Sequence, residues 1–176
     1  MDWWRLRPND QPLPGRPAGL RPNVTELCPN LFIGDFVRPE DIAWLSAQFG
    51  VTAIQSLQDA DDLRISGLDV AGLSVAADRC GVKFARTPVP DGSADQLGAR
   101  LGSVLAQLAA LVRAGERVYL HCNAGLNRAP TVAIAYLHSR CGMPLEEALA
   151  YVKRRRPCGP YLAVLEQFFA APKERG

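Results

Sequence analysis

The sequence predicts an α/β protein with a central, mostly parallel sheet of about five strands, flanked by helices on both faces. Three observations lead to this fold class. From Val24 onward, short β-branched and apolar runs alternate with longer helical patterns. No period of roughly 20 to 50 residues indicates a repeat architecture. The connections between these elements are short, which favours a sheet covered by helices on both sides.

Five runs have the length and apolar content of strands. The last of them is the type of short apolar run expected of a buried parallel strand. In chain order, the predicted strands are Val24–Cys28, Leu31–Gly34, Val51–Leu57, Val82–Thr87 and Arg117–His121.

Six segments have helical patterns. Four prolines (Pro39, Pro130, Pro144 and Pro160) stand near predicted helix starts, where a missing N–H costs little. In chain order, the predicted helices are Pro39–Phe49, Leu68–Cys80, Asp95–Ala114, Arg128–Cys141, Leu145–Arg156 and Tyr161–Ala170.

The first 22 residues differ from the rest of the chain. They contain five prolines and four arginines, and they show neither helical nor strand periodicity. We expect residues 1–22 to form an extended lead-in and residues 23–176 to form a single domain, because this length allows one apolar core. No apolar run follows the first charged residues, so no secretory signal is expected.

The composition argues against several classes of protein. A net charge of +2 gives no electrostatic reason to expect nucleic-acid binding. No stretch approaches the roughly 20 apolar residues of a membrane span. The five cysteines are odd in number and lack Cys-x-x-Cys spacing, which argues against a disulfide scaffold and a structural zinc site. We therefore expect a cytoplasmic monomer without a metal.

The most specific pattern is the segment Val-Tyr-Leu-His-Cys-Asn-Ala-Gly-Leu-Asn-Arg-Ala-Pro-Thr at 118–131. A strand is expected to end at His121, a loop of small residues follows, and a helix begins at about Arg128. The N–H groups of residues 123–128 can point inward together, and the helix N-terminus adds roughly half a positive charge. Gly125 permits the bend. The predicted phosphate-binding residues are Asn123, Ala124, Gly125, Leu126, Asn127 and Arg128.

Cys122 stands at the base of this cradle, where the positive field favours its thiolate. Arg128 lies six positions on, and its planar fork can hold two phosphoryl oxygens. Together they supply a nucleophile and charge stabilisation for phosphoryl transfer. The alternative, a buried core cysteine, does not account for the His, Gly and Arg around it. A Walker-type loop is excluded because no Gly-Lys-Ser/Thr follows Gly125.

His-Cys-x5-Arg at 121–128 resembles the signature of the protein-tyrosine-phosphatase superfamily. The intervening Asn-Ala-Gly-Leu-Asn resembles the dual-specificity branch that includes laforin and the plant starch-excess glucan phosphatases. Similarity to the plant enzymes extends to Pro39–Ile42, Arg128–Tyr136 and Arg155–Pro160, and covers most of residues 24–170. The resemblance implies the dual-specificity phosphatase fold and cofactor-free hydrolysis of phosphomonoesters, on phosphoproteins or phosphoglucans, through a phosphocysteine.

Hydrolysis also needs a proton donor for the leaving oxygen. The family places this acid just after a strand, and the resemblance selects Asp91 in Val89–Asp95. Asp95 is the rival, although it stands where a helix N-cap is expected. By resemblance, His121 supports the nucleophile through hydrogen bonds; a packed strand-end histidine is the alternative.

Two features depart from the family pattern. Ala129 stands where dual-specificity phosphatases usually have a hydroxyl residue that assists hydrolysis of the phosphocysteine. This departure keeps open a second function, a weakly active or inactive phosphate-binding interaction module. Gly92 stands where glucan phosphatases are expected to have an aromatic residue, and Asp61–Leu73 also lacks aromatic residues. The neutral cradle side chains favour a singly phosphorylated substrate over a polyphosphorylated inositol.

Overall fold

A computed structural model describes residues 16–170. Its sheet has five strands in the order β1-β2-β5-β3-β4. The strands are β1 (Thr25–Cys28), β2 (Leu31–Gly34), β3 (Ala53–Ser56), β4 (Lys83–Arg86) and β5 (Val118–His121). Only β1 pairs in antiparallel fashion; the pairings among the other four are parallel. The predicted fold class is confirmed.

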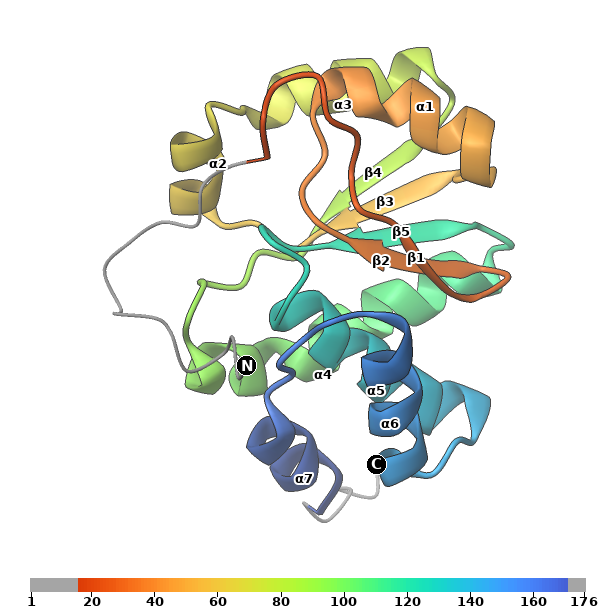
Figure 1. The fold of residues 1–176 in the computed structure, drawn as a ribbon, viewed down its shortest axis with the longest axis vertical. Helices are drawn as coiled ribbons and strands as arrows, with labels where there is room; N and C mark the ends of the chain where they lie inside the picture. The colour runs from red at the N-terminus through yellow and green to blue at the C-terminus, as the bar shows by residue number, and fades with distance from the viewer. Residues whose placement is uncertain (1–15, 171–176) are drawn as a thin grey trace.

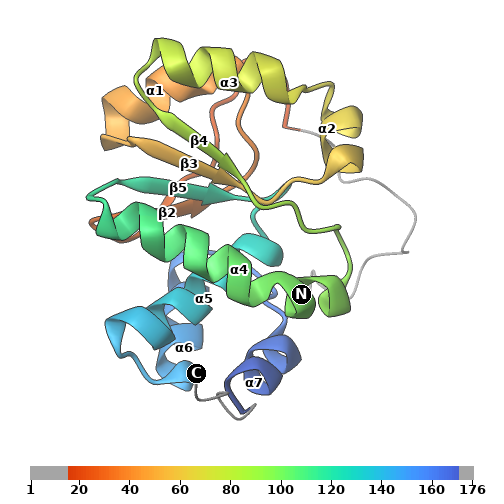
Figure 2. The ribbon, with the colours of Figure 1, turned by 180° about the vertical axis from the view of Figure 1, so that it is seen from behind.

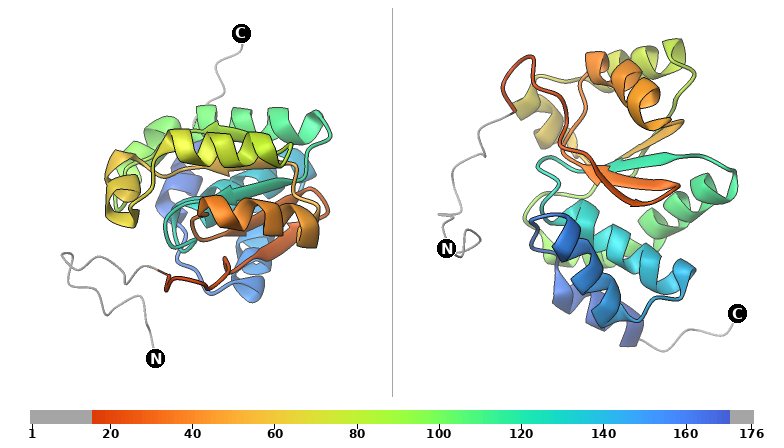
Figure 3. Two further views of the ribbon diagram at one scale, coloured as in Figure 1. Left: turned by 90° about the horizontal axis from the view of Figure 1, so that it is seen from above. Right: turned by 45° about the vertical axis from the view of Figure 1, so that its right-hand side comes forward.

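Helices cover both faces of the sheet (Figures 1 and 2). One face carries α1 (Pro39–Phe49), α2 (Ala60–Ser66) and α3 (Val70–Arg79). The opposite face carries α4 (Ala94–Arg113), α5 (Arg128–Cys141), α6 (Leu145–Arg155) and α7 (Leu162–Ala170). The right-hand view of Figure 3 shows the sheet between these two layers. None of the helices described is long and apolar enough to cross a membrane.

Two apolar clusters fill the spaces between the sheet and the helices. One includes Leu31, Leu120 and Ile134 and extends into α4 and α5. The other includes Phe32, Ile54 and Leu73, between the sheet and α1 and α3. Successive residues of a strand face opposite sides of the sheet, so fully buried strands such as β2 and β5 contribute to both clusters.

The parallel register brings four connections to one edge of the sheet. Gly34 and Ser56 both pair with His121, and Ser56 pairs with Arg86. The carboxyl ends of β2, β3, β4 and β5 therefore meet at the same edge, where ligands bind in open α/β sheets.

Most predicted elements agree with the structure to within two residues, and the differences have local causes. The helix α2 is absent from the prediction because its seven residues are shorter than a typical helix. A reciprocal capping box between Asp59 and Asp62 supports it, and Gly67 ends it in the left-handed conformation. The predicted N-cap at Asp95 is wrong. Ser93 is the cap of α4, and its hydroxyl accepts a hydrogen bond from the Gln96 N–H.

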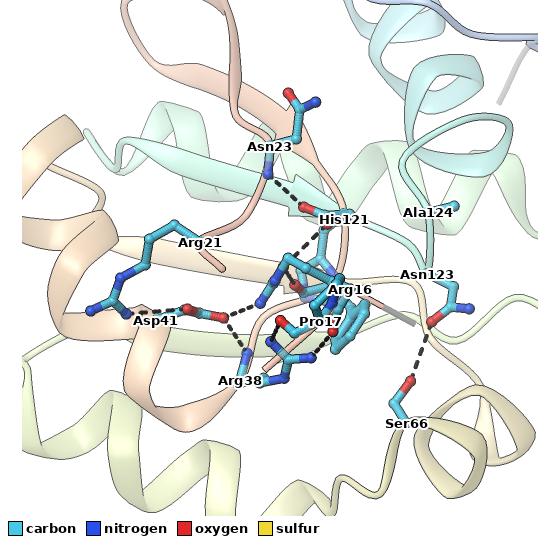
Figure 4. Close-up of polar contacts among 12 residues, drawn as sticks. Arg16, Pro17, Arg21, Asn23, Arg38, Asp41, Ser66, His121, Asn123 and Ala124 are labelled. Carbon is cyan, nitrogen blue, oxygen red and sulfur yellow. Dashed lines mark hydrogen bonds and ion pairs between the residues drawn. The ribbon is translucent and has the colours of Figure 1, made fainter. Parts of the chain in front are cut away.

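The last residues of the predicted lead-in lie against the loop between β2 and α1; its residues 1–15 lie outside the described range. The Arg16 guanidinium donates to the Phe36 carbonyl oxygen (2.7 Å) and forms ion pairs with Asp35 and Asp41. The Arg38 guanidinium donates to the carbonyl oxygens of Arg16 and Pro17. Figure 4 shows this group of contacts. The segment from Arg16 to Pro22 is thus tied to the folded domain.

Candidate active site

The loop between β5 and α5 has an unusual arrangement of its backbone. Each carbonyl oxygen from Cys122 to Asn127 accepts a hydrogen bond from a group outside residues 122–127. In chain order the donors are His121 Nδ1 (3.0 Å), Phe36 N (3.0 Å), Arg156 Nη2 (3.4 Å), Arg156 Nε (2.6 Å), Gly159 N (2.8 Å) and Thr131 N (3.0 Å).

This arrangement fixes the direction of the loop N–H groups. In a trans peptide unit the C=O and the following N–H point in opposite directions. Because the carbonyl groups are held from outside, the N–H groups of residues 123–128 point toward the interior of the loop. Together with the N-terminus of α5, they form a concave set of donors of the kind that binds anions in proteins.

Gly125 is required at the bend of this loop. Its φ angle is +67°, which is the left-handed region. A Cβ atom there would also lie 2.5 Å from the Gly34 carbonyl carbon and oxygen, and such contacts do not occur. The loop therefore packs against the end of β2 at a distance that only glycine permits.

The Arg128 guanidinium is buried beside the loop, and most of its donors are engaged. Nη1 donates to the Asp62 carboxylate (2.6 Å) and to the Val89 carbonyl oxygen (2.7 Å). Nη2 forms an ion pair with the Asp91 carboxylate (3.1 Å). Nε is buried and has no hydrogen-bond partner among the described residues. Nε is thus a donor available for a ligand.

The charge on Arg128 is secure despite its burial. Burial by itself opposes the charged form, but the Cys122 sulfur, Asp62 and Asp91 outweigh it and raise the pKa of Arg128 above its ordinary value. The guanidinium therefore stays charged at any working pH and can counter a phosphate dianion.

The structure brings Asp91 to the site and places Asp95 elsewhere. Asp91 lies in the connection between β4 and α4, and its half-exposed carboxylate faces the Arg128 fork. Asp95 lies in the first turn of α4 and lines a groove between α4 and α7 that also contains Val164 and Phe168. Of the two candidates for the general acid, Asp91 is the one in contact with Arg128.

Comparison with known proteins identifies the family. The family of dual specificity phosphatase catalytic domains matches residues 45–169, which is most of the chain and includes the loop and Asp91. The chain belongs to the dual specificity phosphatase family. The resemblance inferred from the sequence is confirmed, with a plant phosphoglucan phosphatase and laforin among the relatives.

Several relatives show the extent of the similarity. The amyloplastic phosphoglucan phosphatase DSP4 of Castanea sativa is 34% identical over 147 residues, which cover 82% of this chain and 39% of that protein. Human dual specificity protein phosphatase 2 is 28% identical over 131 residues, or 74% of this chain and 37% of that protein. The chain thus spans about two fifths of the length of these curated relatives.

Solved structures share the fold. The crystal structure of a mouse putative dual specificity phosphatase complexed with zinc tungstate is 28% identical, with a TM-score of 0.65. The alignment covers 88% of this chain and 91% of that chain. The crystal structure of Tk-PTP in the active form has the same fold, with 23% identity and a TM-score of 0.68. That alignment covers 87% of this chain and 97% of the Tk-PTP chain.

Asp62 contacts Arg128, and sequence reasoning missed it. Its carboxylate is buried, accepts from Arg128, and also accepts from the Asp59 N–H (3.1 Å) in the capping box of α2. The Asp-x-x-Asp spacing from Asp59 to Asp62 was a signal for this helix start. The contact with Arg128 had no sequence signal because the residues are 66 positions apart.

His121 bonds the backbone of Cys122. Its Nδ1 lies 3.0 Å from the Cys122 carbonyl oxygen, so Nδ1 carries the proton, and Nε2 is buried without a hydrogen-bond partner in the described chain. Burial lowers the pKa of His121 to about 4, so the ring is neutral at neutral pH. The support that His121 gives to Cys122 runs through the peptide group.

The remaining predicted residues belong to the loop itself or to the first turn of α5. Asn123 Oδ1 accepts from Gln58 Nε2 (3.3 Å) and Ser66 Oγ (3.4 Å), and Figure 4 shows the contact with Ser66. Asn127 Nδ2 donates to the Gly159 carbonyl oxygen (2.6 Å). Ala124 and Leu126 are partly exposed at the loop surface, and Ala129 is fully buried in the first turn of α5. The side chains of residues 123–127 are therefore all neutral.

Proposed function

We propose that the chain hydrolyses phosphomonoesters through a phosphocysteine at Cys122. The observation that carries this proposal is that all six carbonyl groups of residues 122–127 are held by other donors, which turns the N–H groups of residues 123–128 toward the interior of the loop that begins at Cys122. Fixed donors of this kind stabilise a phosphoryl transition state without reorganisation. Membership of the dual specificity phosphatase family supports the same chemistry.

The reaction has two steps. The Cys122 thiolate attacks phosphorus, an S–P bond forms, and the O–P bond to the leaving group breaks. Asp91 donates a proton to the leaving oxygen. In the second step, water attacks the phosphocysteine, Asp91 accepts a proton from that water, and the S–P bond breaks to release inorganic phosphate and the thiolate.

The contacts of Arg128 imply an order for the first step. Nη1 is held by Asp62 and Val89, which leaves Nε and Nη2 for a bidentate grip on phosphate. Nη2 is paired with Asp91, so the bound phosphate takes the place of the Asp91 carboxylate. Asp91, released from the guanidinium, is then the group that protonates the leaving oxygen.

We propose a phosphoprotein or a phosphoglucan as the macromolecular substrate. The names of the relatives include both kinds of phosphatase. One structural observation favours the phosphoprotein. The Phe36 ring, near the loop, lies under the Arg16 and Arg38 guanidinium groups and is buried, so it offers no face to a sugar. Another aromatic residue, Trp44, packs edge-on against Phe49 within the protein.

The test begins with para-nitrophenyl phosphate. We expect steady hydrolysis by the intact chain and none by Cys122→Ser, while Cys141→Ser, at an exposed cysteine, keeps the activity. Phosphate release from phosphotyrosyl peptide, phosphoseryl peptide and amylopectin is then compared on one preparation. Preference for amylopectin would assign the glucan. Activity that survives in Cys122→Ser would refute the mechanism.

The second candidate, a phosphate-binding module with negligible turnover, rests on Ala129. This position is fully buried in the first turn of α5 and has no hydroxyl group. A binding module would release one equivalent of nitrophenol per chain and then stop. If the phosphocysteine accumulates in this way, Ala129→Ser is expected to increase steady-state turnover.

A further inference from the structure

The basic run Lys153–Arg156 at the end of α6 divides into two environments. Lys153, Arg154 and Arg155 are exposed, as expected of cations at a helix C-terminus. Arg156, in contrast, is 4% exposed. Burial therefore separates Arg156 from the other three basic residues of the run.

The acceptors of the Arg156 guanidinium are all neutral oxygens within residues 16–170. On one side, Nε donates to the Gly125 carbonyl oxygen (2.6 Å) and Nη2 to the Ala124 carbonyl oxygen (3.4 Å). On the other side, Nη1 donates to the Asn23 carbonyl oxygen (2.9 Å) and to Thr25 Oγ1 (3.2 Å). No carboxylate within residues 16–170 lies within ion-pairing distance of the Arg156 guanidinium. Burial of an unpaired cation is costly.

The two loop acceptors define what the guanidinium does to the cradle. Holding the Ala124 carbonyl outward turns the Gly125 N–H inward, and holding the Gly125 carbonyl outward turns the Leu126 N–H inward. These are the two peptide units at the tip of the loop. The other units are held by His121, Phe36, Gly159 and Thr131, so the orientation of the tip depends on one side chain.

We propose that Arg156 is a positioning residue for the anion cradle. Its fork orients the peptide units of Ala124 and Gly125 toward a bound oxyanion, and its unpaired charge stabilises the dianion from behind the loop. The catalytic part of this inference rests on the proposed phosphatase function, whereas the anion-binding part does not. A guanidinium is needed because the fork spans two carbonyl groups at once.

The experiment compares Arg156→Met with Arg155→Met in the full chain. Arg155 is the matched control because it is adjacent, carries the same charge and lies exposed over the Tyr151 ring. The probes are tungstate, whose affinity is measured by calorimetry, and para-nitrophenyl phosphate. We expect Arg156→Met to lower kcat about 100-fold, the loss typical of a misplaced oxyanion donor, and to weaken tungstate binding about 30-fold or more. Arg155→Met should change both by less than about threefold.

Two further variants separate positioning from general support of the fold. Arg156→Lys keeps the charge and loses the fork, so a kcat between those of wild type and Arg156→Met is expected. Thr25→Val removes an acceptor on the β1 side only, so its tungstate affinity should match wild type.

Three results would overturn the proposal. The first is a folded Arg156→Met with tungstate affinity within threefold of wild type. If Arg156→Met does not fold, the second is an Arg156→Lys variant with wild-type kcat and affinity. The third is an equal loss of affinity in Thr25→Val and Arg156→Lys. If the wild-type chain binds tungstate in an Arg156-dependent way but does not hydrolyse para-nitrophenyl phosphate, the proposed function fails and the positioning role stands.

Discussion

Replacing Asp62 by Asn tests whether the buried carboxylate sets the orientation of the Arg128 fork. The side chains of Arg128 and Asp62 are 1% and 5% exposed, and their ion pair measures 2.6 Å. Removing one partner of a buried pair typically costs about 3–5 kcal/mol. Arg128 keeps Val89 and Asp91, and Asn can still accept a neutral hydrogen bond, so we expect a loss of about 2 kcal/mol of unfolding free energy.

The same substitution should affect catalysis through geometry. Nη1 loses its charged acceptor, so Nε and Nη2 are no longer held at a fixed angle to the loop. We expect Asp62→Asn to lower kcat/KM by about 10- to 100-fold. This corresponds to a loss of about 1.4–2.8 kcal/mol in transition-state stabilisation.

Urea unfolding and para-nitrophenyl phosphate kinetics measure the two effects. The matched control is Asp61→Asn, because Asp61 is in the same helical turn, is 78% exposed and pairs only with the exposed Arg64 among described residues. We expect the control to change unfolding free energy by less than about 1 kcal/mol. An Asp62→Asn variant with wild-type kcat/KM would refute the idea that Asp62 orients Arg128.

Three other predictions concern separate parts of the molecule. Asp91→Asn should lower kcat for para-nitrophenyl phosphate about 100-fold or more, whereas Asp95→Asn should leave it within about threefold; the reverse result would reassign the general acid. Burial lowers the pKa of His121 from 6.5 to about 4. Between these pH values the imidazole is protonated in the unfolded chain but not in the folded one. The free energy of unfolding should therefore fall by about 3 kcal/mol as pH falls from 6.5 to 4. Urea titrations at several pH values should show a smaller loss in His121→Asn; equal losses would mean that His121 is not the group responsible. Arg16→Met removes a buried partner of Asp41 and should cost about 2–3 kcal/mol by urea unfolding, whereas Arg21→Met, at a side chain 46% exposed, should cost less than about 1 kcal/mol; equal costs would contradict the burial argument.

The loop between β5 and α5 could be predicted from sequence because its parts are adjacent in the chain. A strand ending at His121, a loop with Gly125 and a helix beginning at Arg128 depend on local pattern and backbone freedom. The helix Arg128–Cys141 agrees with the prediction in both bounds. The short helix α2 was missed because seven residues give too little periodicity to detect.

The partners of that loop could not be predicted in the same way. Arg156 is one of four consecutive basic residues, and only the packing of the turn after α6 turns its side chain toward Gly125 while its neighbours face solvent. Asp62 is likewise one of several acidic residues near the start of α2, and only the parallel register of β3 and β5 brings it to Arg128.

The sequence by itself therefore determined the α/β class, the order of the strands and of all described helices except α2, and the strand end, loop and helix start from His121 to Arg128 that predict a phosphate-binding loop. The tertiary structure decided which distant groups hold that loop open toward an anion: Phe36, Asp62, Arg156 and Gly159. The physical reason is that a local backbone pattern is encoded by neighbouring residues. The direction of a peptide carbonyl or a guanidinium depends instead on hydrogen-bond partners that meet only when the sheet has formed.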